Sequence, residues 1–492
     1  MKYYLIKESS EIPLKSWRTR PKFERALSRA IEYSLKKVGA SFKLSYSEGV
    51  FFLEADQDVS HVLTKVFGIH DLCEVVPHRF TSLDEIVAKA EELFRDAVAG
   101  KKFAVRVKRH GDHPFTSLDV ARAVGSRLLQ YSAGVDLEAP DIEVKIEVRD
   151  EWAYYVLRCW RGLGGLPVGT EGRALTLFSG GFDSTLASFL AAKRGAEVDF
   201  LHFYMGSSES TLAAIDVMRG LSEFLAPYEP VAIFVNLVPV LAELKAKVEG
   251  RIRQVVLRVI MHEIGQEIAG KYGYDAVVTG ESVGQASSQT LRNLKVVDSL
   301  INLRTALLRP LACLDKEEIV SKVRELGLYD AVVRVEEVCK LSEGPVETRA
   351  RIDEVEEAVT RISKDVIEGV VANAKTYKVG DLNPEVVLKE LGADIEVDDV
   401  PENWVLVDIR DKSKYLKDHI PGAIHISELG EDVSKPVVLY CEFGSASLLA
   451  AMELRKLGRE AYSLRGGFAG YRKRRSADIG CARSPAPGSP RS

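Results

Sequence analysis

Four short and almost uninterrupted apolar stretches, separated by helix-length segments, constrain the fold of this chain more than any other feature. The stretches occupy residues 174–178, 198–203, 231–235 and 276–279. A strand that is buried on both faces is apolar along its whole length, and strands that alternate with helices build a parallel sheet. The middle of the chain is therefore predicted to be a doubly wound α/β domain that ends near residue 375.

The flanking sequence predicts further compact units. Ahead of the parallel-sheet domain, helical periodicity alternates twice with short strands, which indicates two α+β units in tandem. Behind it, another strand–helix series predicts a second α/β domain, and a final segment rich in Ser, Pro, Gly and Arg is expected to be a disordered tail. The units are expected at residues 1–59, 60–160, 161–375 and 385–475, with the tail at 476–492.

The same patterns place individual elements in the two α+β units. Strands are expected at 3–6, 51–54, 103–108, 142–148 and 153–157, the last two as a pair, and helices at 20–37, 82–97 and 117–130. A glycine-rich segment at 162–167 is expected to link these units to the parallel-sheet domain.

The composition is that of an ordinary globular protein. The 492 residues are 46% hydrophobic and 28% charged, and the formal net charge is −5. A nucleic acid would therefore have to bind a local cluster of basic residues. The longest apolar stretch, 231–242, is too short to span a bilayer and contains Asn236 and Pro239, and the first residues contain no signal-peptide core. We expect a soluble, cytoplasmic protein without a membrane partner.

A glycine-rich turn is the sharpest local signal of chemistry. The segment 179–184, with the sequence Ser-Gly-Gly-Phe-Asp-Ser, lies between a predicted strand and a helix expected at 186–192. Gly180 and Gly181 allow a tight turn and let a ligand approach the backbone. The free N–H groups at the start of the helix favour an anion such as phosphate. The segment lacks the Gly-Lys-Ser/Thr of a Walker loop, and it predicts a phosphate site, with a purely structural turn as the alternative.

Most of the six cysteines carry no sign of chemistry. They include no Cys-x-x-Cys pair, which argues against a zinc ribbon or a thioredoxin-type site. Scattered cysteines of a cytosolic protein are usually small buried apolar residues. Cys73, Cys159 and Cys313 are therefore assigned to the core, and Cys481 to the tail.

Cys441 has a different context. It lies between a strand expected at 437–440 and a helix expected at 448–457, in a loop that contains Ser445 and Ser447. Backbone N–H groups at the start of a helix stabilise a thiolate or a persulfide. The loop has no Arg or Lys between Cys441 and Ser447. The pattern predicts a reactive cysteine, with a buried structural cysteine as the alternative.

Basic residues concentrate in the second α+β unit. Such clusters supply phosphate contacts that hold RNA without reading its sequence, and a solvated charged face is the alternative. The candidates for RNA binding are Lys101, Lys102, Arg106, Lys108, Arg109 and Arg122, with Arg127 beside them and with Lys15, Arg18, Arg20, Lys22 and Arg25 as a second group.

These motifs resemble those of one protein family. The turn at 179–184 resembles the PP-loop of ATP pyrophosphatases, which cleave ATP between the α and β phosphates to adenylylate a substrate. The whole chain is similar to the ThiI-type tRNA 4-thiouridine synthetases. The matching segments are 11–15 with Arg20 and Phe23 for a ferredoxin-like unit, 103–109, 135–137 and 140–144 for a THUMP domain, 280–282, 284–285, 288–290, 308–311, 315–316 and 337–339 for a PP-loop domain, and 405–410, 419–425, 441–447 and 464–468 for a rhodanese domain.

The resemblance implies roles for individual residues. Cys441 is the implied sulfur carrier, Cys339 a second reactive cysteine, and Lys316 a cation that stabilises charge on the phosphate. Asp183 is implied to lie beside the phosphates and to act through Mg²⁺. The implied ATP-binding residues are Ser179, Gly180, Gly181, Phe182, Asp183, Ser184, Thr185, His202, Phe203, Gly280, Glu281, Ser282 and Gln289.

The resemblance also implies a reaction. ATP, with Mg²⁺, adenylylates the 4-oxygen of a tRNA uridine (position 8 in the family), and a cysteine persulfide on Cys441 then supplies the sulfur of 4-thiouridine. A cysteine desulfurase loads Cys441, Cys339 closes a disulfide with Cys441 or assists release, and a reductant resets the site. The resemblance extends to sulfur supply for the thiazole of thiamine, and a homodimer is the assembly to test.

Two other functions fit part of the pattern. The glycine-rich turn alone also suits a PP-loop enzyme that adenylylates a small molecule, and the basic cluster argues against that reading. An RNA-binding protein that only relays sulfur is the second alternative, and the intact turn at 179–184 argues against it.

Overall fold

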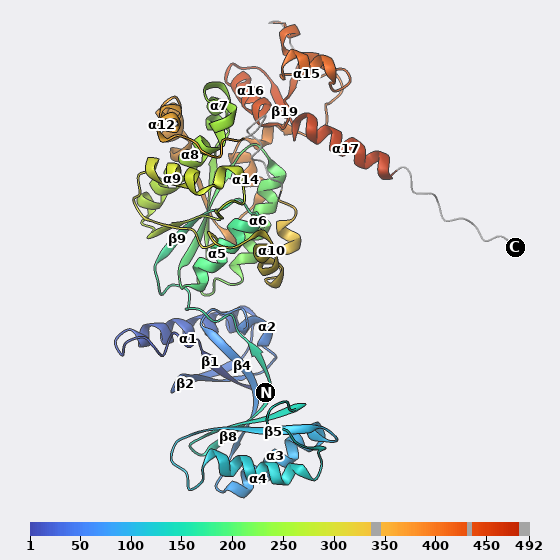
Figure 1. The fold of residues 1–492 in the computed structure, drawn as a ribbon. Coiled ribbons are helices and arrows are strands. Elements are labelled where there is room, and N and C mark those ends of the chain that lie inside the picture. Colours follow the sequence, from blue (N-terminus) through green and yellow to red (C-terminus); the bar gives the residue numbers. More distant parts are fainter. Residues whose placement is uncertain (336–345, 431–434, 482–492) are drawn as a thin grey trace, which may run out of the picture. The chain divides into compact units, whose positions relative to one another are not determined.

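The structure is a computed structural model that describes residues 1–335, 346–430 and 435–481. It contains two compact units, residues 1–171 with 193–195 and residues 172–192 with 196–492, and each unit is described by itself. Figure 1 shows the helices and strands of both units. Within the described residues, no helix combines the length and the apolar character that crossing a membrane requires.

One eight-stranded sheet runs through the first unit, in the order β2-β3-β1-β4-β8-β7-β5-β6. Its strands are β1 (Lys2–Glu8), β2 (Phe42–Ser47), β3 (Val50–Ala55), β4 (Ile69–Arg79), β5 (Lys102–His110), β6 (Gly134–Val135), β7 (Ile142–Arg149) and β8 (Trp152–Arg161). Its helices are α1 (Arg20–Lys37), α2 (Ser60–Leu63), α3 (Leu83–Val98) and α4 (Ser117–Leu129). β4 and β8 are antiparallel partners along most of their length, so they join the two predicted α+β units into one sheet.

Helix α1 shows how the local sequence determines these elements. Pro21 lies in the first turn, where its missing N–H costs nothing. Phe23, Leu27 and Ile31 recur on one face at helical spacing and are buried. Gly39 follows the helix with a left-handed φ of +70°, which favours glycine. The helix therefore begins and ends where the sequence predicts.

Two hydrophobic cores lie along this sheet. The first core includes Leu63 and Ile69, so it extends past the boundary predicted after residue 59. The second core lies under α3 and α4 and includes Phe103, Val124 and Tyr155. The two predicted units thus have separate cores on a shared sheet.

Most predicted elements of the first unit are confirmed. The three helices agree to within one residue, and the pairing of the strands predicted at 142–148 and 153–157 is confirmed as antiparallel. The prediction missed β2, β4 and the short elements α2 and β6. β4 contains Pro77, which is atypical of an inner strand, but Pro77 lies beyond the segment of β4 that pairs with β1.

Three cysteine assignments need correction. Cys73 lies in a buried hydrophobic cluster as predicted, and it forms a disulfide with Cys159, which faces it in the register of β4 and β8. Cys159 is exposed and does not belong to the core. Cys313 is exposed, because it lies in the turn that follows β13 and precedes α10. Cys481 ends helix α17 (Gly467–Cys481), so the predicted tail is helical over its first residues, and 482–492 lie outside the described part of the chain.

The second unit begins with the predicted parallel sheet. Its strand order is β13-β12-β9-β10-β11-β14. The strands are β9 (Arg173–Leu177), β10 (Glu197–Tyr204), β11 (Val231–Asn236), β12 (Ala276–Val278), β13 (Ala306–Leu308) and β14 (Lys375–Lys378). The helices are α5 (Phe182–Lys193), α6 (Ser208–Ser222), α7 (Val238–Lys247), α8 (Gly250–Tyr272), η1 (Ser287–Gln289), α9 (Leu291–Leu300), α10 (Lys316–Glu325), α11 (Tyr329–Val332), α12 (Ile352–Thr360) and α13 (Lys364–Ala372). β14 pairs antiparallel with β11, so the sheet continues past the end predicted near residue 375.

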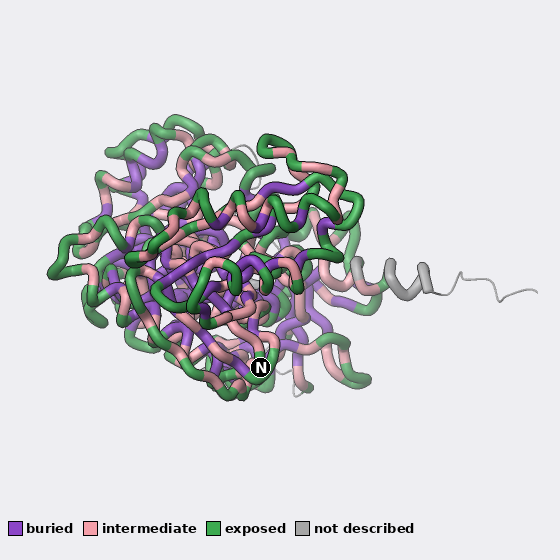
Figure 2. The backbone as a smooth tube through the Cα atoms, turned by 90° about the horizontal axis from the view of Figure 1, so that it is seen from below, coloured by how far each residue is buried: buried purple, intermediate pink, exposed green. Residues whose placement is uncertain are grey.

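A second, smaller sheet completes this unit. Its five strands are parallel, in the order β15-β19-β18-β16-β17. The elements of this part are η2 (Val379–Asp381), α14 (Pro384–Glu390), η3 (Ala393–Ile395), β15 (Glu396–Val397), β16 (Val405–Asp408), α15 (Lys412–Lys417), β17 (Ile424–His425), η4 (Ile426–Glu428), β18 (Val437–Tyr440), α16 (Ser445–Lys456), β19 (Ala461–Leu464) and α17. Figure 2 colours the backbone by the burial of each residue, with buried segments in purple and exposed segments in green.

Candidate nucleotide and sulfur-transfer sites

The glycine-rich turn connects β9, an inner strand of the six-stranded sheet, to α5. Gly180 has a φ of +84°, and a Cβ there would lie 2.8 Å from Ala214, so only glycine fits without strain. The N–H groups of Ser179 and Gly180 donate to Ser184 Oγ at 3.3 and 3.2 Å. Ser184 therefore holds the turn in shape, and the first residues of α5 present their N–H groups at its mouth.

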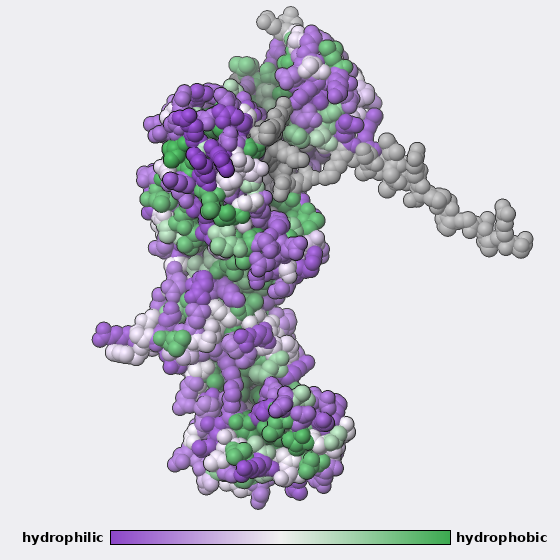
Figure 3. All heavy atoms as spheres, in the orientation of Figure 1, coloured by the Kyte–Doolittle hydropathy of each residue, from purple (hydrophilic) through white to green (hydrophobic). Residues whose placement is uncertain are grey.

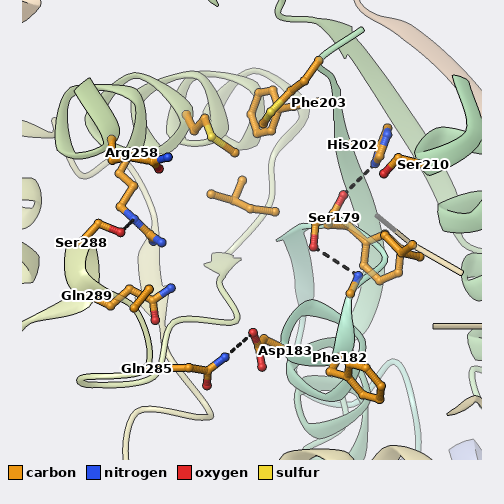
Figure 4. A pocket seen from close by; sticks show the side chains of 18 of the residues that line it. Ser179, Phe182, Asp183, His202, Phe203, Ser210, Arg258, Gln285, Ser288 and Gln289 are labelled. Carbon is orange, nitrogen blue, oxygen red and sulfur yellow. Dashed lines mark hydrogen bonds between the residues drawn. The ribbon is translucent and has the colours of Figure 1, made fainter. Parts of the chain in front are cut away.

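A cavity of about 690 Å³ opens in front of this turn. Asp183 lies at its edge, where its carboxylate accepts hydrogen bonds from Lys316 Nζ at 3.0 Å and from Gln285 Nε2 at 2.7 Å. Figure 4 shows Gln285 reaching toward Asp183 from the opposite wall. The structure thus brings together Asp183 and Lys316, which lie 133 residues apart in the sequence.

The opposite wall of the cavity comes from α8 and η1. Gln254, Arg258 and Met261 line it at helical spacing. Arg258 donates from Nε to Ser288 Oγ at 3.1 Å (Figure 4). Its Nη1 lies 2.8 Å from Glu281 Oε1. Arg258 is a functional candidate that the sequence analysis missed, since it lies in a long helix without a glycine-rich motif. The polar positions spaced by four residues along one face of this helix were the available signal.

Glu281 does not line the cavity, but it contacts Arg258, which does. Burial alone would raise the pKa of Glu281. The hydrogen bond from His262 and the charges of Arg258 and Arg309 outweigh that effect and hold the pKa well below its usual value. Glu281 therefore stays ionised and holds the guanidinium group of Arg258 in place through an ion pair.

His202 forms part of the wall beside the turn. Its Nδ1 lies 2.9 Å from the carbonyl oxygen of Phe178, and its Nε2 lies 3.1 Å from Thr211 Oγ1. Burial lowers the pKa of His202 to about 4, with only a partial offset from the Phe178 carbonyl. The imidazole is thus neutral at physiological pH and ties β10 to the turn and to α6.

The predicted ATP-binding residues divide into two groups. Those that line the cavity are Ser179, Gly181, Phe182, Asp183, His202, Phe203 and Gln289, together with Lys316. Those that support it without lining it are Gly180, Ser184, Thr185, Gly280, Glu281 and Ser282. Lining residues that the sequence analysis missed on the first turn of α6 are Ser207, Ser210 and Thr211.

Cys441 follows β18, an inner strand of the five-stranded sheet, and precedes α16. Its Sγ accepts a hydrogen bond from the N–H of Gly444 at 3.1 Å, and Ser447 Oγ lies 3.6 Å away. The side chain is buried, with 7% of the residue exposed. The predicted Ser447 contact is confirmed, whereas the Ser445 side chain and Cys339 lie outside what the structure describes.

A cation does lie near this loop, although the loop itself has none. Arg410 follows β16, is buried, and pairs with Asp408 at 2.8 Å. Its Nη1 also lies 3.3 Å from Glu442, the residue after Cys441. A search confined to residues 441–447 could not find this arginine, because a neighbouring strand supplies it.

The six predicted RNA-binding side chains belong to residues 101–122, from the residue before β5 into α4. Arg106 and Lys108 share one exposed face of β5. Arg106 pairs with Glu143 at 3.2 Å, Lys102 with Asp136 at 3.6 Å, and Arg109 donates to the carbonyl oxygen of Gly111 at 2.8 Å. Lys101, Lys108 and Arg122 are exposed. Figure 3 shows hydrophilic side chains over much of the visible face of this unit, with smaller hydrophobic areas between them.

Comparison with known proteins covers each of these regions. Family models match residues 3–73 (ThiI ferredoxin-like domain), 80–157 (THUMP domain), 169–363 (Thiamine biosynthesis protein, ThiI) and 388–474 (Rhodanese-like domain). A tRNA sulfurtransferase of Desulfurococcus amylolyticus is 44% identical over 96% of this chain and 98% of its own length. One of Pyrobaculum aerophilum is 36% identical over 92% of this chain and 95% of its own length.

A solved structure is similar to a large part of the chain. It is a 4-thiouridine synthetase–RNA complex with bound ATP, with a TM-score of 0.68 and 27% identity, and it covers 77% of this chain and 99% of its own. The fold, the order of the domains and the identity to full-length relatives agree. The chain belongs to the ThiI family of tRNA sulfurtransferases.

Proposed function

We propose that this protein adenylylates a tRNA uridine with ATP and transfers sulfur from Cys441 to form 4-thiouridine. The observation that carries the proposal is the pairing of Asp183 with Lys316 at the mouth of the glycine-rich turn, inside a cavity large enough for a nucleotide. A turn that served the fold alone would not need a carboxylate and an ammonium group at the cavity edge.

The cavity suits ATP. The N–H groups of the first turn of α5 favour the phosphates, and Lys316 and Arg258 supply positive charge from two sides. Asp183 is a single carboxylate at the phosphate position, which suits Mg²⁺ bound by one carboxylate and by the nucleotide's own oxygens. When bound there, Mg²⁺ would offset the charge of the phosphates.

The uracil 4-oxygen forms a bond to the α phosphorus as the N3 proton of the base is lost to solvent, and the bond between the α and β phosphates breaks. Pyrophosphate leaves, and the base becomes an adenylylated species from which AMP can depart. Lys316 lies at the cavity edge and stabilises the charge that develops on the phosphate.

Sulfur transfer then uses Cys441 as the carrier. A cysteine desulfurase loads it as a persulfide, whose terminal sulfur attacks C4 of the base as AMP leaves. The thiolate of Cys339 attacks the sulfur of Cys441, which releases the thiolated base and forms a Cys339–Cys441 disulfide. A reductant returns both cysteines to thiols. Gly444 N–H and Ser447 Oγ hold the carrier sulfur and stabilise its anionic form.

The first unit is proposed to hold the tRNA through phosphate contacts. Replacing Arg106, Lys108 and Arg109 by Glu is expected to lower tRNA affinity and to reduce the slope of log affinity against log salt by about three. Filter binding across a salt series measures both. The control replaces Lys36, Lys37 and Lys43 by Glu, which gives the same change of net charge on exposed residues of α1 and β2. Equal affinity of the two triple variants would remove the RNA-binding surface from the proposal.

Exchange of labelled pyrophosphate into ATP tests the activation step. We expect exchange that requires tRNA and Mg²⁺. Exchange without tRNA would instead favour adenylylation of a small molecule. The proposal has three further parts. The target is uridine at position 8, which nucleoside mapping of the tRNA tests. The protein also supplies sulfur for thiazole synthesis, which a thiazole assay tests, and it forms a homodimer, which sedimentation tests.

A further inference from the structure

A buried carboxylate connects the two sheets of the second unit. Glu396 begins β15, the edge strand of the five-stranded sheet, and only 6% of the residue is exposed. Its Oε2 accepts a hydrogen bond from Tyr204 at 3.3 Å and a shorter one from Ser208. Tyr204 ends β10 and Ser208 begins α6, so both hydroxyl groups belong to the six-stranded sheet and its helices.

The residues that Glu396 holds lie directly beside the nucleotide cavity. Ser207 and Ser210 line the cavity on either side of Ser208, which does not. Thr211, one residue further, lies 3.1 Å from the imidazole of His202. A shift of the first turn of α6 would therefore move one wall of the cavity.

The carboxylate is poorly satisfied for a group so deeply buried. Burial raises the pKa of Glu396, and the hydrogen bonds from Ser208 and Tyr204 and the charge of Arg465 only partly offset it. Glu209 adds a like charge. Within the described residues, neither Glu396 Oε1 nor Arg465 Nε has a hydrogen-bond partner. Burying a carboxylate costs desolvation free energy, so packing alone does not explain a glutamate at this position.

Two hydrogen bonds to backbone carbonyl oxygens also connect the two sheets of this unit. Arg219 of α6 donates to the carbonyl oxygen of Leu382, and Asn236 at the end of β11 donates to the carbonyl oxygen of Leu391. These bonds hold the segment that leads to β15 against α6 and β11. Glu396 differs from them because it reaches the one turn of α6 that lines the cavity.

We propose that Glu396 is a positioning residue for the nucleotide: from the rhodanese-like region, it fixes the first turn of α6 and so sets the affinity of the cavity for ATP. The inference rests on the proposed function in that ATP occupies this cavity. If the turn is released, only a fraction of molecules keep the binding geometry, and the apparent dissociation constant rises in proportion. Because such coupling is reciprocal, bound ATP also stabilises the contact between β15 and the first turn of α6.

Titration of the full-length protein with a fluorescent ATP analogue tests this inference. Glu396→Ala and Ser208→Ala are each expected to raise the dissociation constant about fivefold or more. The double variant should be no weaker than Glu396→Ala, because Glu396→Ala already removes the hydrogen bond to Ser208. Glu396→Gln keeps an acceptor oxygen for Ser208 and should stay within about twofold of the wild type. Asp394→Asn, an exposed carboxylate two residues earlier, is the matched control.

The outcomes separate the inference from the proposed function. If the wild type does not bind the analogue, the proposed function fails. If the wild type binds and Ser208→Ala binds equally well, the positioning role fails, whether or not Glu396→Ala folds. A lower melting temperature with an unchanged dissociation constant would assign Glu396 to stability alone. An additive double variant, or a Glu396→Gln variant as weak as Glu396→Ala, would also overturn the inference.

Discussion

The nucleotide turn at 179–184 and the thiol turn at 441–447 use the same backbone arrangement in two different sheets. Each turn follows an inner strand of a parallel sheet and leads into a helix, and each contains a glycine with a left-handed φ, +84° at Gly180 and +93° at Gly444. In the first turn the glycine N–H donates to Ser184 inside the loop. In the second it donates to the sulfur of Cys441.

This difference decides what each turn presents to a substrate. The nucleotide turn uses Ser184 to hold its glycine backbone and leaves Asp183 at the edge of a cavity, where Lys316 and Gln285 hold it. The thiol turn directs its free N–H at one reactive atom and keeps that atom buried. One arrangement suits a large ligand that binds and leaves, and the other suits a single atom carried on the protein.

Removing the thiol gives the largest expected effect and separates the two turns most clearly. Cys441→Ser should lower thiouridine formation about 10³-fold or more, because the hydroxyl cannot carry a persulfide. Pyrophosphate exchange should remain at the wild-type rate. Cys313→Ser, at an exposed cysteine, is the control. Thiouridine formed at the normal rate by Cys441→Ser with a persulfide donor would end the carrier assignment.

The converse variant acts on the nucleotide turn. Asp183→Asn should lower the rate of pyrophosphate exchange about 10²-fold, since it removes the charge that faces Lys316 and the metal. Persulfide loading of Cys441, followed by mass spectrometry of the protein, should be unchanged. Glu317→Gln, an exposed carboxylate next to Lys316, is the control and should behave as the wild type in both assays. Loss of persulfide loading in Asp183→Asn would show that the two turns are not independent.

A smaller effect concerns the neutral imidazole beside the nucleotide turn. Burial lowers the pKa of His202 to about 4, whereas the unfolded chain has a value near 6.5. The unfolded state therefore binds the extra proton first as the pH falls. The contribution of His202 is complete above about pH 6.5 and is lost between pH 6.5 and 4, to a total of about 3 kcal/mol.

Urea unfolding at several pH values measures this effect as a difference between the wild type and His202→Gln. The wild type should lose more of its free energy of unfolding over this range than the variant does. Parallel losses in both proteins would contradict a buried neutral His202.

The parts of the fold that a short segment determines were predictable. Helix α1 carries its own proline, apolar face and terminal glycine, and the glycine-rich turn is contiguous in the sequence. β4 was missed because its pairing with β1 and β8 comes from distant segments and overrides a sequence that contains Pro77. The Cys73–Cys159 disulfide depends on the same long-range register.

The candidate sites divide in the same way. Asp183 and Cys441 lie in contiguous motifs, and the predicted order of strand, turn and helix is found in both. Arg258 reaches its site from a helix with no motif of its own. Arg410 lies in the matching segment 405–410, far from Cys441 in the sequence, so only the three-dimensional arrangement shows that it lies beside the thiol turn. Glu396 is the extreme case, because its partners lie 188 and 192 residues away.

The central claim is that ATP bound at the nucleotide turn activates a tRNA base to which Cys441 delivers sulfur. Mass spectrometry of nucleosides tests it most directly, after tRNA is incubated with the protein, ATP, Mg²⁺ and a Cys441 persulfide that carries isotopically labelled sulfur. The account predicts 4-thiouridine that contains the labelled sulfur and forms only when ATP is present. Labelled thiouridine without ATP, or tRNA that stays unmodified while the persulfide is consumed, would contradict it.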